Sequence, residues 1–347
     1  MIRLAFLGCG AATRMHARTL AKLGGSGVLE AAGDGVPATA LFFASRDRAR
    51  AEEYRRRLDG AGAFGSYEDA LADERIEAVL IATPPQSHME LALRALEAGK
   101  HVIVEKPPFL RSVDFDVVGA SARRADRQVM VAENYVYKPL LRELNELLEA
   151  GVIGDVHFIH INAIKHQQTG GWRDDIALAG GGAMFEGGIH WVSFLSNLSL
   201  PLRRVTGYRA GPRAGEGEGE GEREGEGDRE PERSMLAVLE YEGGAVGTLS
   251  YSWRIRSTFR GLRLSRIYGS AGSISFESNG LFLMVRGRRF RVALPGVRDM
   301  LGYRAMFRDF LDCIARNRPS RYTIDLARRD LRLVEDIYCS ALRSTDH

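Results

Sequence analysis

The sequence has few cysteines and no long apolar run, and both absences narrow the class of protein. Only three cysteines occur in 347 residues, Cys9, Cys313 and Cys339, without a paired-cysteine motif. This argues against a disulfide framework and a thiolate zinc site, so we expect no bound metal and a reducing, cytoplasmic environment. The first residues, MIRLAFLGCG, reach glycine too soon for the apolar core of a signal peptide. No stretch approaches the roughly 20 apolar residues that a membrane helix needs.

A basic cluster interleaved with aromatic residues is also missing, so we expect no nucleic acid as a partner. The formal net charge is +3, although residues 216–232, EGEGEGEREGEGDREPE, alone carry −7. Alternating Glu and Gly repel one another and offer little to bury, which predicts a disordered surface loop at about 211–233. The basic excess of the remaining chain suits either a small anionic ligand or a scattered basic surface.

Strand and helix patterns alternate over residues 1–134. Apolar runs at 2–8, 39–45, 77–85, 101–104 and 128–134 predict strands, and the segments between them carry helical spacing. Runs without polar alternation suit parallel strands that are covered on both faces. Residues 1–134 are therefore expected to form an α/β domain with a doubly wound parallel sheet.

From about residue 135 the pattern changes to long strands joined by glycine turns. A helix at 140–154 precedes strand-like segments at 155–166, 235–255, 262–278 and 281–294, and two helices near 303–316 and 323–342 close the chain. Successive strands without intervening helices predict an α+β domain, residues 135–347, with a large, mostly antiparallel sheet.

A glycine-rich turn follows the first predicted strand. In GCGAAT, Gly8 permits the tight turn and Gly10 lets a pyrophosphate approach the backbone, with the N-terminus of the next helix facing its charge. Thr13 stands at the third fingerprint position, where glycine or alanine is usual. The context indicates a dinucleotide-binding Rossmann domain.

The tip of the second strand bears on which dinucleotide is bound. Ser45 and Arg46 stand where an NAD site would place a carboxylate, and an Arg fork matches a phosphate. We therefore expect NADP as the preferred cofactor, with NAD as the alternative if Arg46 is only an exposed loop residue and Asp47 binds the ribose.

The strand in HVIVEKPPF ends in an acid and a base. Lys106 follows the buried run and lies at the carboxyl end of the strand, where ligands bind in open α/β sheets. Its ammonium can hydrogen-bond a carbonyl oxygen and pass a proton, while Glu105 is near enough to hold the amine. The alternative is a surface ion pair.

A carboxylate and an imidazole stand four residues apart in GGGAMFEGGIHWVSFLSN. Glu186 and His190, followed by Ser193 and Asn197, fall on one face of a predicted helix. Such a pair can bind a substrate hydroxyl and bias the protonation of the histidine, or it can be a solvated pair on the helix surface. The glycines at 180–182 favour the first interpretation because they permit a ligand to approach the backbone.

Several motifs, in this order, resemble the Gfo/Idh/MocA family of oxidoreductases. They include GCGAATRMH, TPPQSHMELALRALEAGKHVIVEKP, AEN, EAGVIGDVHFIH, GGWRDDIALAGGGAMFEGGIHW and the closing YRAMFRDFLDCI. The family's catalytic aspartate, four residues before a histidine, and its Glu-Lys-Pro lysine fall on Glu186, His190 and Lys106, with Glu in place of Asp. The cofactor-binding residues expected with this resemblance are Gly8, Gly10, Ala11, Ala12, Ser45, Arg46, Thr83, Pro84, His88, Glu105, Lys106, Asn134, Trp172 and Arg173.

The resemblance implies a dehydrogenase or reductase that transfers a hydride between NAD(P) and a secondary hydroxyl or ketone. The substrate would be a small polyhydroxylated molecule: a sugar, a cyclitol or a nucleotide-linked sugar. The resemblance also implies an open sheet that builds a homodimer or homotetramer. Two alternatives stay open: redox-assisted elimination or glycoside cleavage with an internally regenerated cofactor, and a regulatory protein that binds the cofactor without turnover.

Overall fold

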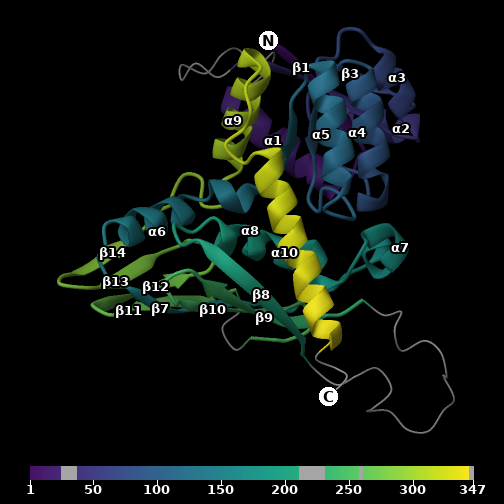
Figure 1. The fold of residues 1–347 in the computed structure, drawn as a ribbon. Coiled ribbons are helices and arrows are strands. Elements are labelled where there is room, and N and C mark those ends of the chain that lie inside the picture. Colours follow the sequence, from purple (N-terminus) through teal and green to yellow (C-terminus); the bar gives the residue numbers. More distant parts are fainter. Residues whose placement is uncertain (25–36, 211–230, 258–260, 344–347) are drawn as a thin grey trace, which may run out of the picture. The chain divides into compact units, whose positions relative to one another are not determined.

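The chain folds into two compact units, shown in the computed structural model of Figure 1. Residues 1–24, 37–210, 231–257 and 261–343 are described. The first unit comprises Met1–Asn134 and Gly302–Arg329, and the second comprises Tyr135–Leu301 and Asp330–His347. The domain limits expected from the sequence, 1–134 and 135–347, stay a prediction, but residues 302–329 pack with the first unit.

The first unit contains a six-stranded parallel sheet with the order β3-β2-β1-β4-β5-β6. Every pairing within it is parallel, and β1 lies between β2 and β4, where the direction of strand addition reverses. This order is that of a dinucleotide-binding Rossmann sheet. Its strands are β1 (Ile2–Leu7), β2 (Thr39–Ala44), β3 (Gly62–Phe64), β4 (Ala78–Ile81), β5 (His101–Val104) and β6 (Val129–Val131).

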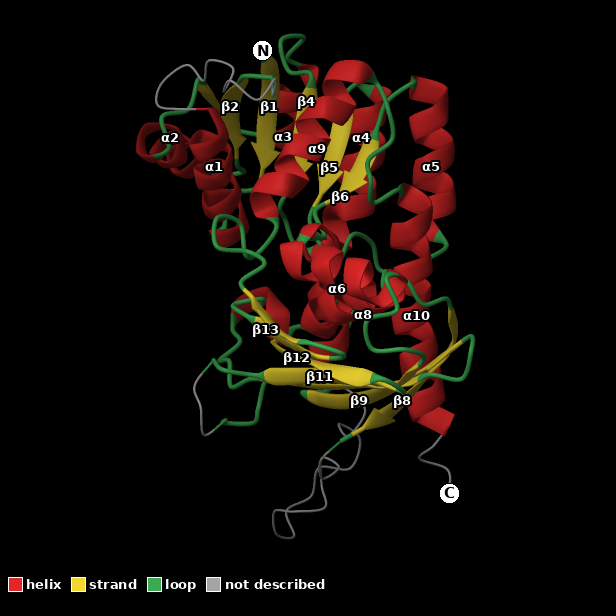
Figure 2. Ribbon diagram, turned by 90° about the vertical axis from the view of Figure 1, so that its left-hand side faces the viewer, coloured by secondary structure: helices red, strands yellow, loops and turns green. Residues whose placement is uncertain are grey.

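Helices cover both faces of this sheet (Figure 2). All four residues of β4 and all four of β5 are therefore buried. Helix α4 packs on α5, and α1 packs on α9. The rings of Phe6 and Phe43 stack at 5.4 Å across β1 and β2. The helices are α1 (Ala11–Gly24), α2 (Arg48–Arg57), α3 (Tyr67–Ala72), α4 (His88–Glu97), α5 (Asp114–Ala125) and α9 (Tyr303–Arg316), with short 3-10 turns η1 (Pro85–Ser87) and η2 (Asn134–Tyr137).

The second unit contains an eight-stranded sheet with the order β14-β13-β12-β11-β7-β10-β9-β8. Its pairings are antiparallel except for β7 with β10, which is parallel. The strands are β7 (Val156–Ile164), β8 (Leu202–Arg209), β9 (Ser234–Tyr241), β10 (Val246–Ser252), β11 (Leu264–Gly269), β12 (Gly272–Glu277), β13 (Leu283–Arg286) and β14 (Phe290–Ala293).

One face of this sheet forms the core of the second unit. Ile159, Ile161 and Ala163 of β7 are buried, whereas their neighbours Phe158 and His160 are exposed, as expected for side chains that alternate along a strand. The remaining helical segments are α6 (Pro139–Glu149), η3 (Gly171–Asp174), α7 (Ile176–Ala179), η4 (Met184–Gly188), α8 (Ile189–Ser196) and α10 (Ile324–Arg343).

The predicted fold class is confirmed: a parallel doubly wound sheet is followed by a large, mostly antiparallel one. Strands β3 and β8 were not predicted. Of the expected loop at about 211–233, residues 211–230 lie outside the described residues, but Glu232 differs from the expectation because its side chain is buried and hydrogen-bonded. No helix in the described part of the chain is both long enough and apolar enough to cross a membrane.

Candidate active site

The carboxyl ends of four parallel strands bring the predicted cofactor-binding residues of the first unit to one edge of the sheet. The registers β2-β1-β4-β5 run in parallel, so the segments that follow these strands are neighbours. These segments are Gly8–Gly10 after β1, Ser45–Arg46 after β2, Thr83–Pro84 after β4 and Glu105–Lys106 after β5.

The two glycines of the first turn are constrained differently. Gly8 has a φ of +108°, and a Cβ there would lie 2.8 Å from the carbonyl oxygen of Ala82. A Cβ at Gly10 would meet no heavy atom within 4 Å. Packing within the protein therefore explains Gly8 but not Gly10, whose surroundings leave room for a group that approaches the backbone. Ala11 and Ala12 begin α1 beside this space.

Three side chains hold the carbonyl groups of this turn. The Thr13 hydroxyl donates to the carbonyl of Gly8 at 2.6 Å, so the departure from the usual fingerprint closes the turn by a side-chain hydrogen bond. Arg50 Nε donates to the carbonyl of Cys9 at 2.8 Å, and the Tyr54 hydroxyl donates to that of Gly10 at 3.1 Å. Sequence reasoning missed Arg50 and Tyr54, since nothing local marks them as partners of a turn some 40 residues away.

At the tip of β2, Arg46 is exposed, whereas the carboxylate of Asp47, the alternative ribose ligand, is already hydrogen-bonded. Asp47 caps α2: its carboxylate accepts the N–H groups of Ala49, at 2.9 Å, and Arg50. Ser45 is buried and accepts the N–H of Asp47, whereas Arg46 is exposed. The alternative ribose ligand thus already has a structural role.

His88 ties the loop after β4 to the loop after β5. Its side chain is buried, with Nε2 at 2.8 Å from the carbonyl oxygen of Thr83 and Nδ1 at 3.0 Å from that of Pro107. Burial lowers the pKa of His88, although these carbonyls and Glu105 act in the opposite direction. The arrangement gives His88 a role in holding Thr83 and Pro84 in place.

Glu105 is a buried carboxylate that is held by two groups. It pairs with His16 Nε2 from α1 and accepts the backbone N–H of Lys106 at 2.9 Å. Burial alone would raise the pKa of Glu105, but the His16 interaction, together with Lys106, holds it below its usual value. The acid expected to hold the Lys106 amine thus also fixes the backbone from which that amine projects. Asn134, buried after β6, completes the predicted set in this unit.

In the second unit, Glu186 lies in a π-helical turn and not in a regular helix. Met184–Gly188 is π-helical, and α8 begins at Ile189. The single helix face expected for Glu186, His190, Ser193 and Asn197 is therefore interrupted, and Ser193 is fully buried. A π turn spaces residues differently from an α-helix and is frequent at functional sites.

Glu186 is almost fully buried and is paired with a predicted cofactor-binding residue. Arg173 Nε donates to Glu186 Oε1 at 3.2 Å. The Arg173 guanidinium also lies 4.4 Å from the centroid of the Trp172 ring. Trp172, Arg173 and Glu186 therefore form one contiguous group from η3 and η4.

His190 stacks on an aromatic ring that covers a buried lysine. The rings of His190 and Tyr135 are 4.5 Å apart and nearly parallel. Lys138 is fully buried, and its Nζ lies 3.9 Å from the centroid of Tyr135 and 5.5 Å from that of Trp191. Sequence reasoning did not single out Lys138, because a lysine at the start of an amphipathic helix usually points to solvent.

Glu232 anchors the start of the π turn. Its carboxylate accepts the N–H of Met184 at 2.8 Å and the hydroxyl of Tyr338 at 2.7 Å. Burial raises the pKa of Glu232. A Cβ at Gly182 would lie 1.9 Å from Glu232 Oε2, so the glycine run allows this close packing and is not explained by a ligand alone.

The predicted residues divide between the units. Lys106 and the nucleotide-side residues belong to the first unit, whereas Trp172, Arg173, Glu186 and His190 belong to the second. In the second unit, Arg173 contacts both Glu186 and Trp172, whereas His190 stacks on Tyr135. The joint action of Lys106 with Glu186 and His190 stays a prediction.

Family models match most of each of the two predicted domains. A family model described as the oxidoreductase family with an NAD-binding Rossmann fold matches residues 2–133, and the GFO/IDH/MocA C-terminal domain matches residues 141–275. The uncharacterised oxidoreductase YfiI of Bacillus subtilis is 28% identical over 258 residues, 69% of this chain and 63% of YfiI. The D-xylose 1-dehydrogenase (NADP(+)) of Hypocrea jecorina is 36% identical over 117 residues, 31% of this chain and 28% of that enzyme.

These matches span less than two thirds of the curated relatives' own lengths. Among solved structures, levoglucosan dehydrogenase in complex with NADH and levoglucosan has a TM-score of 0.80 at 20% identity, and the alignment covers 99% of this chain and 97% of that one. At this identity the likeness shows the fold. The two family models, which follow one another along most of the sequence, establish that the chain belongs to the Gfo/Idh/MocA family of NAD-binding oxidoreductases.

Proposed function

We propose that the protein is an NAD(P)-dependent dehydrogenase or reductase that acts on a secondary hydroxyl or ketone of a sugar, cyclitol or nucleotide-linked sugar. The observation that carries the proposal is the unfilled approach to Gly10, at the switch point of the parallel sheet. Family membership supports the same chemistry.

The residues at this edge fit a nicotinamide dinucleotide. Gly8, Gly10 and the N-terminus of α1, whose first turn has no acidic residue, would hold the pyrophosphate. Thr83, Pro84 and Asn134 would line the path of the cofactor. When bound, the cofactor supplies the hydride acceptor or donor.

Three side chains are assigned to the reaction itself. Lys106 Nζ donates a hydrogen bond to the reacting oxygen, and a ring nitrogen of His190 takes the hydroxyl proton during oxidation and returns it during reduction. Glu186, held by Arg173, orients the substrate hydroxyl and the imidazole. Glu186, which stands where the family has Asp, is carried by a π turn.

The decisive experiment is single-turnover hydride transfer across a panel of ketosugars and cyclitols, followed by nicotinamide absorbance. We expect Lys106→Met and His190→Ala each to lower the rate by about 10²-fold or more, the usual contribution of a general acid or base. His160→Ala is the matched control because His160 is an exposed histidine on β7. Unchanged rates in Lys106→Met and His190→Ala would remove these roles, and binding without transfer across the whole panel would favour a regulatory protein.

We further propose that NADP(H) is the preferred cofactor. Arg46 at the tip of β2 is exposed, while the neighbouring Asp47 is committed to capping α2, which leaves a cation where a 2′-phosphate would lie. By its name, the Hypocrea relative also uses NADP(+).

The preference is tested by comparing turnover with NADPH and NADH. Arg46→Ala should reduce the preference for NADPH by about tenfold, since a charge-assisted pair is worth roughly 1.5–3 kcal/mol. Arg57→Ala, which removes an exposed arginine at the far end of α2, should leave it unchanged. A wild-type enzyme that favours NADH would overturn the assignment.

A further inference from the structure

A cavity of about 770 Å³ in the second unit has three cationic side chains among its lining residues. Its walls include Lys165, Arg256 and Arg263, with the imidazole of His166, and among its described lining residues there is no carboxylate. A volume in this range is that of a pocket for a small organic ligand, far above what a single water molecule fills.

The walls of the cavity lie on a regular backbone frame. Strands β7 and β10 are parallel, so they end at the same edge of the sheet, and the pairing continues beyond both ends. The N–H of Lys165 donates to the carbonyl of Ser252 at 2.9 Å, and that of Gln167 donates to Trp253 at 2.8 Å. Lys165 and His166 therefore project from a segment that is held by backbone hydrogen bonds.

Arg263 is oriented but not neutralised. Its Nη2 donates to Asn279 Oδ1 at 2.8 Å, and the Asn279 amide donates in turn to Glu277 at 3.0 Å. The buried Nε of Arg263 has no hydrogen-bond acceptor among the described residues. A buried donor without an acceptor is destabilising, so this position favours an acceptor from outside the described chain.

Two of the cations also lack an acidic partner. Within the described residues, neither Arg256 nor Arg263 forms an ion pair with a carboxylate. Elsewhere in the chain arginines commonly do, as Arg204 does with Glu240 and Arg291 with Glu143. Two arginines that no described carboxylate pairs with, together with a lysine around the same cavity, favour a ligand that carries more than one negative charge.

The cavity is one side chain away from Glu186. Lys165 Nζ lies 5.9 Å from the centroid of the Tyr251 ring. On the other side, a Cβ at Gly187 would lie 1.9 Å from the Tyr251 hydroxyl, so this hydroxyl contacts the π turn next to Glu186. Burial raises the pKa of Tyr251, and the charge of Glu186 adds to the effect. A ligand in the cavity would thus extend towards the proposed catalytic carboxylate.

We propose that this cavity binds the phosphate of a phosphorylated substrate, either a sugar phosphate or the diphosphate of a nucleotide-linked sugar. The inference rests on the proposed function for the part of the substrate that reacts. A phosphate group carries up to two charges and several acceptor oxygens, which match two arginines and a lysine better than the single charge of a sugar carboxylate does.

The test is calorimetric titration of the full-length chain, without nicotinamide cofactor, with D-glucose 6-phosphate, UDP-glucose, D-gluconate and D-glucose. We expect both phosphorylated probes to bind, and D-glucose and D-gluconate to bind at least about tenfold more weakly. The tighter of the two phosphorylated probes identifies the monoester or the diphosphate as the source. Arg256→Ala and Arg263→Lys should each weaken binding of the phosphorylated probes about tenfold or more.

Arg254→Ala is the matched control. Arg254 is an exposed arginine two residues from Arg256 that is not among the lining residues, so its loss should leave the affinity unchanged. The proposal is overturned if D-glucose binds as tightly as its phosphate, or if Arg256→Ala and Arg263→Lys behave like Arg254→Ala. Failure of the proposed function is distinguishable, since phosphate binding without hydride transfer to any probe would leave the cavity assignment intact.

Discussion

Gly8 and Gly10 lie two residues apart, but alanine should affect them in different ways. Gly8→Ala places a methyl group 2.8 Å from the Ala82 carbonyl at a φ of +108°, and should lower the free energy of unfolding by about 1–3 kcal/mol. Gly10→Ala meets no neighbour within 4 Å and should leave stability within about 0.5 kcal/mol of wild type. Its methyl group would instead occupy the space assigned to the pyrophosphate and weaken NADP(H) binding about tenfold or more. Urea unfolding and fluorescence titration measure both effects, and undiminished affinity in Gly10→Ala would refute the cradle.

His101 gives the stability of the first unit a predictable dependence on pH. Its Nδ1 accepts the N–H of Gln128 at 3.0 Å, and burial lowers its pKa from 6.5 to about 4. Between these values the unfolded chain binds the extra proton, so the free energy of unfolding falls as the pH decreases through this window. Between pH 7 and pH 5 this residue should account for a loss of about 1–2 kcal/mol.

The variant His101→Asn separates this effect from other titrations. The Asn oxygen can still accept the Gln128 N–H but does not titrate. Urea unfolding of both proteins at pH 7 and pH 5 should therefore show a smaller loss in the variant. An identical pH dependence would mean that His101 keeps its ordinary pKa in the folded protein.

At the scale of single residues, the sequence predicted the strand-tip residues and missed their partners. Lys106 and Gly10 could be found because each follows an apolar run whose end is known to bind ligands. His16, Arg50 and Glu232 could not, since each acts through a contact with a residue 41 to 89 positions away, and no spacing rule links such pairs. Only the folded chain brings them together.

At the scale of elements, the misses have physical causes. The sequence of β8 lacks a clear strand pattern because one of its inward positions is glycine. A Cβ at this residue, Gly207, would lie 2.2 Å from the carbonyl of Ile337. Strand β3 has only three residues. The π turn at Met184–Gly188 shares the apolar pattern of an α-helix, so periodicity alone did not separate the two.

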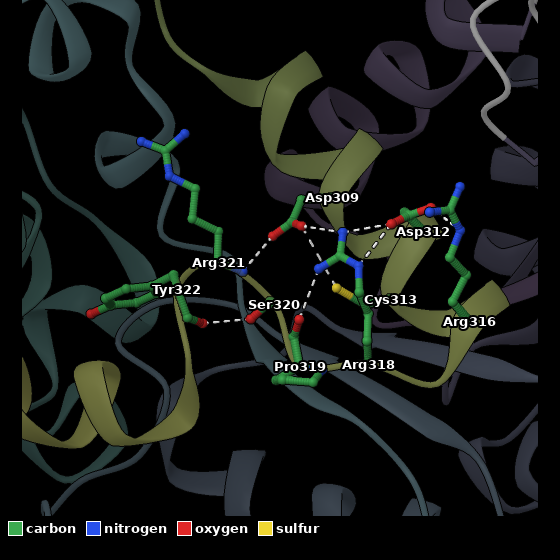
Figure 3. A network of polar contacts seen from close by, with 9 residues as sticks. All are labelled: Asp309, Asp312, Cys313, Arg316, Arg318, Pro319, Ser320, Arg321 and Tyr322. Carbon is green, nitrogen blue, oxygen red and sulfur yellow. Dashed lines mark hydrogen bonds and ion pairs between the residues drawn. The ribbon is translucent and has the colours of Figure 1, made fainter.

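The turn between α9 and α10 is held by one arginine, as Figure 3 shows. Arg318 Nη2 lies 2.8 Å from Asp309 Oδ1 and 2.6 Å from Asp312 Oδ2, and the other oxygen of Asp309 accepts the N–H of Arg321. Arg318→Ala should lower the free energy of unfolding by about 1–2 kcal/mol. The substitution removes the ion pairs with Asp309 and Asp312, and the largely buried Asp309 carboxylate then loses its charged partner. Chemical denaturation measures the change.

Arg316→Ala is the control for this element. Arg316 contacts the same Asp312 at 2.9 Å, but its side chain is 71% exposed, so its loss should cost less than about 0.5 kcal/mol. Equal losses in the two variants would show that the turn is not fixed by Arg318.

At the scale of the whole molecule, the outward face of the eight-stranded sheet is the proposed contact between subunits. The strand registers place five exposed apolar side chains on this one face, Phe158, Tyr208, Leu264, Phe290 and Val292. These side chains are spread over several strands of the face, and it is the face that we propose a homodimer or homotetramer covers.

The proposed assembly predicts a change of mass on charging that face. Phe158→Glu, at a side chain that is 52% exposed on the central strand β7, should shift the protein towards the 38.3 kDa monomer in size-exclusion chromatography with light scattering. The substitution should leave the monomer folded, because the exposed side chain contributes little to the core. It should weaken association, because the new carboxylate would be buried in the subunit contact. Val297→Glu changes a side chain that is 82% exposed but lies outside the strands, so the oligomer should persist. A monomeric wild type would mean that this face forms no stable subunit contact. An oligomer that survives Phe158→Glu would place the contact elsewhere, because a carboxylate buried in an apolar interface would lose its hydration and destabilise that interface.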